Sequence, residues 1–108
     1  MSDRVNTTRL QEMARAYTVS AVLYAALDVG LFTHVSNGCV KEADLANATG
    51  LRRIDIDRLV SCALSLDLLD WDGEELRNQA DVEAYLVEGK ERYAGPWMMF
   101  TRPDVPGW

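Results

Sequence analysis

The chain has 108 residues, which suits one domain and leaves too little for two. Its formal net charge of -6 disfavours nucleic acid as a partner, because an acidic surface repels phosphate. Cys39 and Cys62 form no CxxC pair and have no histidine pair beside them, which argues against a disulfide framework or a zinc site. Both are expected to be small buried hydrophobic residues.

The start of the chain predicts neither a signal peptide nor a membrane span. Asp3 and Arg4 precede further polar residues, where a signal peptide has a basic stretch followed by an apolar one. Residues 16–27 carry no charge, but a helix needs roughly 20 apolar residues to cross a bilayer. A cytoplasmic protein is therefore expected.

A first helix is predicted to begin near residue 7, where Thr8 and Gln11 have the spacing of a capping box. From Ala16 to Leu27 this helix is apolar on nearly every face, which requires protein around it. So short a chain has difficulty burying such a helix alone, so we expect a second chain to cover it. The residues predicted to face across a two-fold axis are Tyr17, Val19, Val22, Leu23, Tyr24 and Leu27.

Two further helices and a connecting piece are predicted before residue 67. Leu31 and Phe32 follow Gly30 and indicate a short amphipathic segment ending in a turn. Residues 41–49 predict a helix closed by Gly50, and apolar spacing predicts another to about Leu66, with Asp55 in its first turn.

A short β-hairpin is predicted next, with Asp72-Gly73 as its turn, because Asp-Gly accepts the positive φ angles of tight hairpins. Residues 80–87 predict a helix, and residues 91–100 predict another that is interrupted at Gly95-Pro96. The fold class is therefore mainly α: a winged-helix-like dimerisation domain with a small β-hairpin wing and extra helices at both ends. We expect the domain to span residues 1–90, followed by a helix or linker over residues 91–108.

Several stretches in this order resemble a known family: LYAALDVGLF (23–32), ADLANATGL (43–51), DRLVSCALSLDLLDWDGEEL (57–76) and DVEAYL (81–86). Over about residues 10–87 the chain resembles the N-terminal dimerisation domain of S-adenosylmethionine-dependent O-methyltransferases of plant-type and polyketide-tailoring kind. It departs from them at Lys41, where the family often has a capping threonine, and at Ser61, where it usually has arginine. Asp67 replaces a usual glycine, and aspartate tolerates the left-handed conformation better than most residues.

The resemblance implies a dimerisation or scaffolding domain or subunit of a small-molecule (secondary-metabolite) O-methyltransferase, which is not catalytic alone. The family's methyl transfer belongs to a following Rossmann-like domain, whereas the seven glycines here form no GxGxG motif. We therefore expect no cofactor site in this chain and S-adenosylmethionine only in a missing domain or partner chain. The expected partner is a second copy or a catalytic methyltransferase chain, and the sequence leaves open whether the chain is a natural subunit or a fragment.

No catalytic or metal-binding residue is predicted. His34 is the only histidine and is expected to pack at a helix end or on the surface. The pairs Asp55/Asp57 and Glu74/Glu75 are expected to be solvated, because neighbours at such spacing diverge on a helix. An apolar cluster suits a small aromatic ligand, and in the resembled family this region helps to roof the acceptor pocket; core or interface packing is the alternative. The cluster consists of Trp97, Met98, Met99 and Phe100.

The alternative function is a winged-helix transcription regulator that binds DNA. The basic residues that favour it are Arg52, Arg53 and Arg58 at the third predicted helix. Acidic residues are interleaved with these arginines, and more of them crowd the wing, where a phosphate backbone would have to approach. The acidic residues of the wing are Asp70, Asp72, Glu74 and Glu75.

Overall fold

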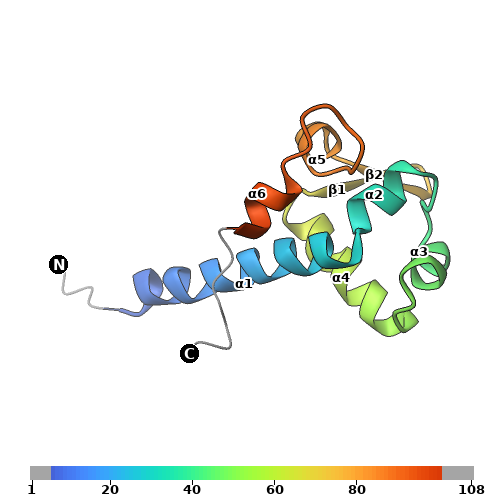
Figure 1. Ribbon diagram of the computed structural model, residues 1–108. Helices are drawn as coiled ribbons and strands as arrows, with labels where there is room; N and C mark the ends of the chain where they lie inside the picture. The colour runs from blue at the N-terminus through green and yellow to red at the C-terminus, as the bar shows by residue number, and fades with distance from the viewer. Residues whose placement is uncertain (1–5, 101–108) are drawn as a thin grey trace.

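The computed structural model describes residues 6–100, apart from the side chain of Phe100, and these residues are mainly helical with one two-stranded sheet (Figure 1). The elements in chain order are α1 (Thr8–Val29), α2 (Leu31–Ser36), α3 (Glu42–Thr49), α4 (Arg53–Ser65), β1 (Leu69–Asp72), β2 (Glu75–Asn78), α5 (Ala80–Tyr85) and α6 (Gly95–Phe100). Three helices followed by a hairpin, with extra helices around them, confirm the predicted winged-helix-like fold class.

The first helix begins where predicted, but the predicted capping box at Thr8 does not form. Thr8 is already helical, and its N–H donates to Asn6 Oδ1 at 2.9 Å. Gln11 Nε2 donates to Thr7 Oγ1 at 2.8 Å, so the glutamine bonds a side chain and not a backbone N–H. Gly30, at φ 69°, ends α1 and immediately precedes α2, because glycine adopts this left-handed conformation without steric cost.

Most of α1 lies outside the body of the molecule. Figure 1 shows its N-terminal part projecting as an arm, and every residue from 6 to 21 is exposed. Only the last turns pack inward, where Ala26 is fully buried and Leu23 and Leu27 contact the core. The radius of gyration is 16.1 Å, whereas about 13 Å is typical of a compact chain of this length.

The core lies between α2, α3, α4 and the hairpin, and its side chains come from all of them. Amphipathic spacing on α4 turns Ile56, Val60 and Ala63 inward, as the sequence predicted for this helix. The short α2 contributes three of its six side chains. The largest fully buried side chains are Phe32, Leu31, Leu45, Ile56, Leu69, Leu76 and Val60.

The hairpin forms one residue later than predicted. Asp72 pairs with Glu75 at the end of the ladder, so the turn residues are Gly73 and Glu74 rather than Asp72 and Gly73. Gly73 has φ 66°, which fits a turn with glycine at its first central position. The N–H of Leu76 donates to the carbonyl of Val40 at 2.8 Å, which joins the wing to the α2–α3 connection.

The C-terminal segments differ from prediction in their boundaries. The helix α5 ends at Tyr85, two residues before the predicted end at Val87. Residues 91–94 are not helical, and α6 begins at Gly95 and Pro96 instead of being interrupted there. Proline is favoured in a first helical turn, because N–H groups there have no acceptor within the helix and the lack of one costs no hydrogen bond.

Glu83 on α5 joins three separate segments of the fold. It accepts hydrogen bonds from Ser36 Oγ at 2.7 Å and from Asn78 Nδ2 at 2.9 Å. Lys90 Nζ lies 3.1 Å from its Oε2. The hydrogen bond from Asn78, followed by those from Ser36 and Lys90, holds the pKa of Glu83 below its ordinary value.

Cys39 is half-buried, but Cys62 is exposed, so the prediction of burial is wrong for Cys62. Its side of α4 faces α1 across an open groove rather than the core. Within residues 6–100, no group of three or more histidine, cysteine or acidic side chains has a metal-binding arrangement. No helix in the same range is long and apolar enough to cross a membrane.

Candidate functional site

The projecting part of α1 carries large apolar side chains that are more than half exposed. Leu10, Met13 and Tyr17 are 57%, 61% and 62% exposed. Their spacing of three and four residues places them on one face of the helix, and we call these three residues the α1 stripe. A helix with an exposed apolar face of this kind is suited to contact another protein surface.

An open groove with a volume of about 380 Å³ lies between α1 and α4. Its α1 side is formed mainly by small side chains, including Thr18, Ala21 and Ala25, which keep the groove wide. The remaining lining residues are Val22, Val29, Leu51, Asp55, Arg58, Leu59 and Cys62. We call this feature the α1–α4 groove, and it adjoins the projecting arm.

The two charged residues of the α1–α4 groove carry opposite charges. Arg52 Nε donates to Asp55 Oδ2 at 2.9 Å, outside the apolar lining. This hydrogen bond holds the pKa of Asp55 below its ordinary value, and the positive charge of Arg58 acts in the same direction. Asp55 therefore stays ionised at neutral pH, and the lining residues other than Asp55 and Arg58 carry no charge.

The six residues predicted for a dimer interface lie on different sides of α1. Tyr17 and Val19 are exposed on the arm, and Val22 lines the α1–α4 groove. Leu23 and Leu27 are half-buried against the chain's own core. Tyr24 is half-buried and, seven residues after Tyr17, continues the same face of the helix.

A second, smaller cleft of about 260 Å³ lies between α1, α5 and α6. Trp97 and Met98, two residues of the predicted aromatic-ligand cluster, contribute to its wall together with Leu23 and Tyr85. Trp97 is 66% exposed, whereas Met98 also packs against the core. Met99 is half-buried and does not line this cleft, and the side chain of Phe100 lies outside the described residues.

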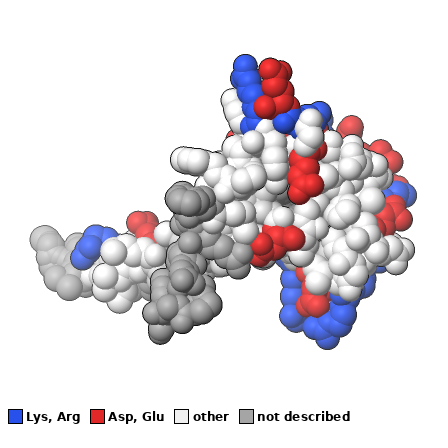
Figure 2. All heavy atoms as spheres, in the orientation of Figure 1, with Lys and Arg blue, Asp and Glu red and all other residues white. Residues whose placement is uncertain are grey.

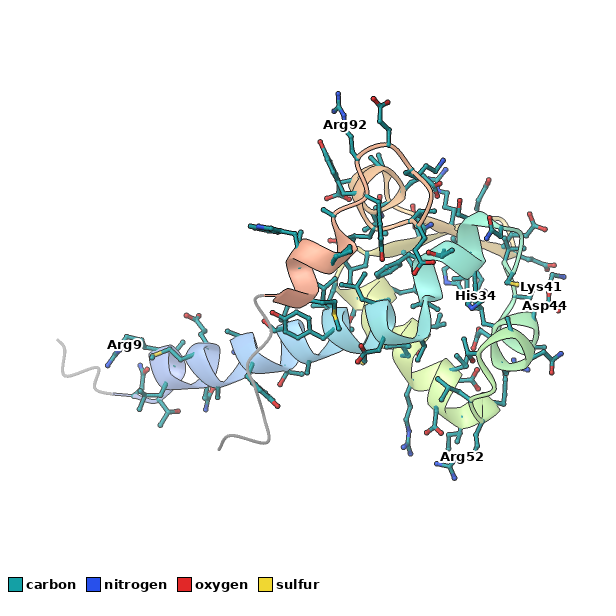
Figure 3. The ribbon with its side chains drawn as sticks, in the orientation of Figure 1. Arg9, His34, Lys41, Asp44, Arg52 and Arg92 are labelled. Atoms are coloured by element: carbon teal, nitrogen blue, oxygen red, sulfur yellow. The ribbon has the colours of Figure 1, made fainter. Side chains whose placement is uncertain are left out.

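On the surface that a winged helix would offer to DNA, two of the three predicted arginines, Arg52 and Arg53, form ion pairs with aspartates of the same helix. Arg52 bonds Asp55 through two nitrogens, and Arg53 Nε donates to Asp57 Oδ1 at 2.9 Å. Figure 2 shows acidic side chains among the basic ones at this lower edge of the body, where Figure 3 labels Arg52. A hydrogen bond from Glu42 also lowers the pKa of Asp57 while the same contact raises the pKa of Glu42.

His34 lies in the last turn of α2 and is half-buried, as expected for a residue at a helix end. Figure 3 shows it on the opposite side of the molecule from Arg9, which marks the projecting arm. The predicted wing acids are exposed or half-buried, and Asp70 forms an ion pair with Arg77 at 3.2 Å. None of these groups forms a catalytic pair within the described range, so apolar surface is the distinctive feature of the molecule.

Comparison with known proteins shows that the chain is similar to part of several methyltransferases. No protein-family model matches the chain. The 3-hydroxy-5-methyl-1-naphthoate 3-O-methyltransferase of Streptomyces sahachiroi is 29% identical to it over 102 residues, which are 94% of this chain and 30% of that enzyme. The N,N-dimethyltransferase OxyT of Streptomyces rimosus is 26% identical to this chain over 86 residues, which are 80% of this chain and 25% of OxyT.

Solved structures agree with this relationship. An O-methyltransferase family protein from Burkholderia thailandensis superposes with a TM-score of 0.78 and 27% identity, covering 88% of this chain and 28% of that protein. CalO1, a methyltransferase of calicheamicin biosynthesis in its S-adenosylhomocysteine-bound form, gives a TM-score of 0.72 and 26% identity. That match covers 86% of this chain and 28% of CalO1. The chain thus spans less than a third of the length of these methyltransferases, and the family resemblance seen in the sequence is confirmed.

Leu10 and Met13 on the exposed face of α1, and Leu59 and Cys62 on the α4 side of the groove, were not among the predicted site residues. Leu10, Met13 and Tyr17 recur at helical spacing in the sequence. The interface was nevertheless predicted within residues 16–27, because that stretch carries no charge. The exposure of Cys62 had no signal in the sequence, because a cysteine in an apolar helix is more often buried.

Proposed function

We propose that this chain is the dimerisation or scaffolding part of a small-molecule O-methyltransferase and that it associates through α1. The observation that carries the proposal is the arm of α1, along which every residue from 8 to 21 is exposed although the arm bears Leu10, Met13 and Tyr17. Association would remove these side chains from water, which is favourable by about 25 cal/mol per Å² of apolar surface. An obligate interface of this kind buries about 2,000 Å² or more in total.

The test is the mass of the chain in solution, measured by sedimentation at micromolar concentration. We expect twice the monomer mass of 12.1 kDa. Tyr17→Asp should raise the dissociation constant by at least about 100-fold, because association would bury an unpaired charge. Its far-ultraviolet circular dichroism should be unchanged, since Tyr17 makes no core contact.

Ala16→Asp is the matched control for this variant. It adds the same charge one residue earlier, about 100° around the helix from the α1 stripe, at a position that is also exposed. It should leave the dimer intact. A stable monomer of the unmodified chain at micromolar concentration would contradict the proposal.

Leu23→Asp, at another predicted interface position, is a poorer test. Leu23 is half-buried against the core, so a charge there would damage the fold as well as any interface.

We further propose that catalysis and S-adenosylmethionine binding belong to another domain or to a partner chain. Two observations support this: the homologues are about three times as long, and this chain has no glycine-rich GxGxG loop. Titration calorimetry of the chain with S-adenosylmethionine should give no binding heat, and saturable heat would contradict this part of the proposal. The family relationship adds no support for the alternative of a DNA-binding regulator.

We also propose that the predicted apolar cluster lines a substrate pocket that the partner completes. The cluster consists of Trp97, Met98, Met99 and Phe100. Trp97 and Met98 support it, because both line the cleft between α1, α5 and α6. The division into a domain over residues 1–90 and a segment over residues 91–108 also stays a prediction. The helix α6 lies against α1, so residues 95–100 have contacts with the first part of the chain.

A further inference from the structure

The turn between α2 and α3 contains an asparagine followed directly by a glycine. Asn37 is the C-cap residue of α2, and Gly38 follows it at φ 106°. Figure 1 shows this connection on the side of the body opposite the projecting arm. Both residues are exposed, and beyond the neighbours of Gly38 no described atom lies within 4 Å of the position that a Cβ on it would take. The turn is therefore open to water, and nothing packs over its glycine.

Asn37 differs from the other asparagines of the described residues in its contacts and its neighbour. Asn6 Oδ1 accepts a hydrogen bond from a backbone N–H at 2.9 Å, and Asn78 Nδ2 donates one to a backbone carbonyl at 2.9 Å. Asn47 lies within α3 and is followed by alanine. In the part of the chain that the structure describes, no hydrogen bond holds the side-chain amide of Asn37. Its amide carbon is therefore accessible to a nucleophile.

We propose that Asn37 is a site of spontaneous covalent modification, in which the backbone nitrogen of Gly38 attacks the side-chain amide carbon of Asn37. A bond forms between Gly38 N and Asn37 Cγ, and the bond from Cγ to Nδ2 breaks. The Nδ2 group leaves as ammonia with the proton that the Gly38 nitrogen gives up. Water then opens the cyclic imide at one of its two carbonyl carbons, which leaves an aspartyl or an isoaspartyl residue at position 37.

The glycine favours this reaction, whereas the folded turn slows it. Gly38 has no Cβ to hinder the approach of its nitrogen. At the observed ψ of 10°, however, this nitrogen is turned away from the side chain of Asn37, and the Gly38 N–H donates to the carbonyl of Val35 at 3.2 Å. Attack therefore requires this hydrogen bond to open and the Asn37 backbone to rotate. Local opening of an exposed turn costs much less free energy than global unfolding, so the reaction takes place in the folded protein.

The modification has a structural consequence for the wing. Either product places a carboxylate at the C-terminal end of α2, where the helix carbonyl groups disfavour negative charge. The isoaspartyl product also lengthens the main chain by one carbon, because the chain then passes through Cβ and Cγ. The carbonyl of Val40, three residues after Asn37, accepts the 2.8 Å hydrogen bond from Leu76 that joins the wing to this connection. Modification should therefore loosen the attachment of the wing.

Trypsin makes the reaction measurable at a single residue. Cleavage after Arg15 and Lys41 releases residues 16–41, in which Asn37 is the only amide side chain. Cleavage after Lys41 and Arg52 releases residues 42–52, in which Asn47 is the only one, so this peptide is the internal control. The folded chain is incubated at mildly alkaline pH, and mass spectrometry of both peptides follows the exchange of an amide group for a carboxyl group. Chromatography separates the aspartyl and isoaspartyl forms.

We expect residues 16–41 to convert at least about ten times faster than residues 42–52, because only Asn37 is followed by a residue without a Cβ. Both the aspartyl and the isoaspartyl products should appear. Equal rates in the two peptides, or no conversion in either, would overturn the proposal.

Asn37→Gln is the matched variant for the structural consequence, since it keeps the amide but requires a larger and less readily formed ring. Hydrogen exchange at the Leu76 N–H should become faster in the incubated natural chain and stay unchanged in the incubated variant. Unchanged exchange in a fully converted natural chain would overturn the effect on the wing.

Discussion

At the scale of single residues, Glu83 is a carboxylate that connects three separate segments. It receives hydrogen bonds from Ser36 on α2 and Asn78 on β2 and lies beside Lys90. Asn78 also donates to the carbonyl of Phe32, which extends this network to the core helix. The network holds the wing, α2 and α5 in register around the core.

Glu83→Gln should make the chain less stable at neutral pH and less sensitive to acid. The folded-state pKa of Glu83 lies below its ordinary value of 4.5, so its ionised contacts stabilise the fold fully above that pH. This stability is lost as the pH falls through the folded-state pKa. Urea unfolding should show a loss of about 1 kcal/mol for the variant at pH 7. The difference should shrink as the pH is lowered from 4.5 through the folded-state pKa, and a difference that stays constant as the pH falls would contradict the assignment.

Asp67 and Cys62 show how far single residues could be predicted. Asp67 has φ 58°, the left-handed conformation that the resemblance implied for a position where glycine is usual. Backbone geometry of this kind depends on local sequence, so it was predictable. The exposure of Cys62 depends on which elements pack against α4. That packing is set by residues far apart in the sequence, so the local pattern around Cys62 did not predict it.

At the scale of elements, the connection between α5 and α6 contains a close contact between the Tyr93 ring and Gly95. Gly95 is buried, and the Tyr93 phenol lies directly over it, so a Cβ added at Gly95 would overlap the ring. The N–H of Ala94 donates to the carbonyl of Tyr85 at 2.7 Å and closes the connection. Burial, followed by the nearby charge of Glu88, raises the pKa of Tyr93.

Gly95→Ala should therefore displace the Tyr93 ring and lower the free energy of unfolding by about 1–3 kcal/mol. The effect should be largely removed when Tyr93→Ser is already present, because no ring then remains to be displaced. A double-mutant cycle from denaturant unfolding measures this coupling. Additive effects of the two substitutions would show that the close approach has no energetic consequence.

Element order was predictable, and exact boundaries were less so. Helices closed by Gly30 and Gly50 follow a simple physical rule, and both glycines have the expected positive φ. The hairpin turn shifted by one residue because the pairing of Asp72 with Glu75 fixes the register. For α1, apolar residues on nearly every side predicted that a partner was needed, but they did not specify which face would meet it.

At the scale of the whole molecule, the arm adds length while its residues 6–21 stay exposed. The extents of 52 × 34 × 27 Å reflect an element that extends away from the body (Figure 1). Side chains such as Leu10 and Met13 are more than half exposed in the single chain. The proposed association would therefore add to the stability of this part.

Thermal unfolding should be concentration dependent. If a second copy covers the arm only in the folded state, raising the chain concentration favours the folded dimer by mass action. The midpoint of thermal unfolding should rise by several degrees between about 1 and 100 μM, and Tyr17→Asp should remove most of this dependence. A midpoint that is constant over this range would show that folding and association are not linked.

The excess of acidic groups has a consequence for how two copies would meet. Each chain carries a net charge of -6, so two approaching copies repel one another at long range, while the contact surface itself is apolar. Dissolved ions screen that repulsion over a Debye length of about 8–10 Å at ordinary ionic strength. Added salt would therefore strengthen self-association of this chain, whereas it weakens the attachment of a basic protein to a polyanion.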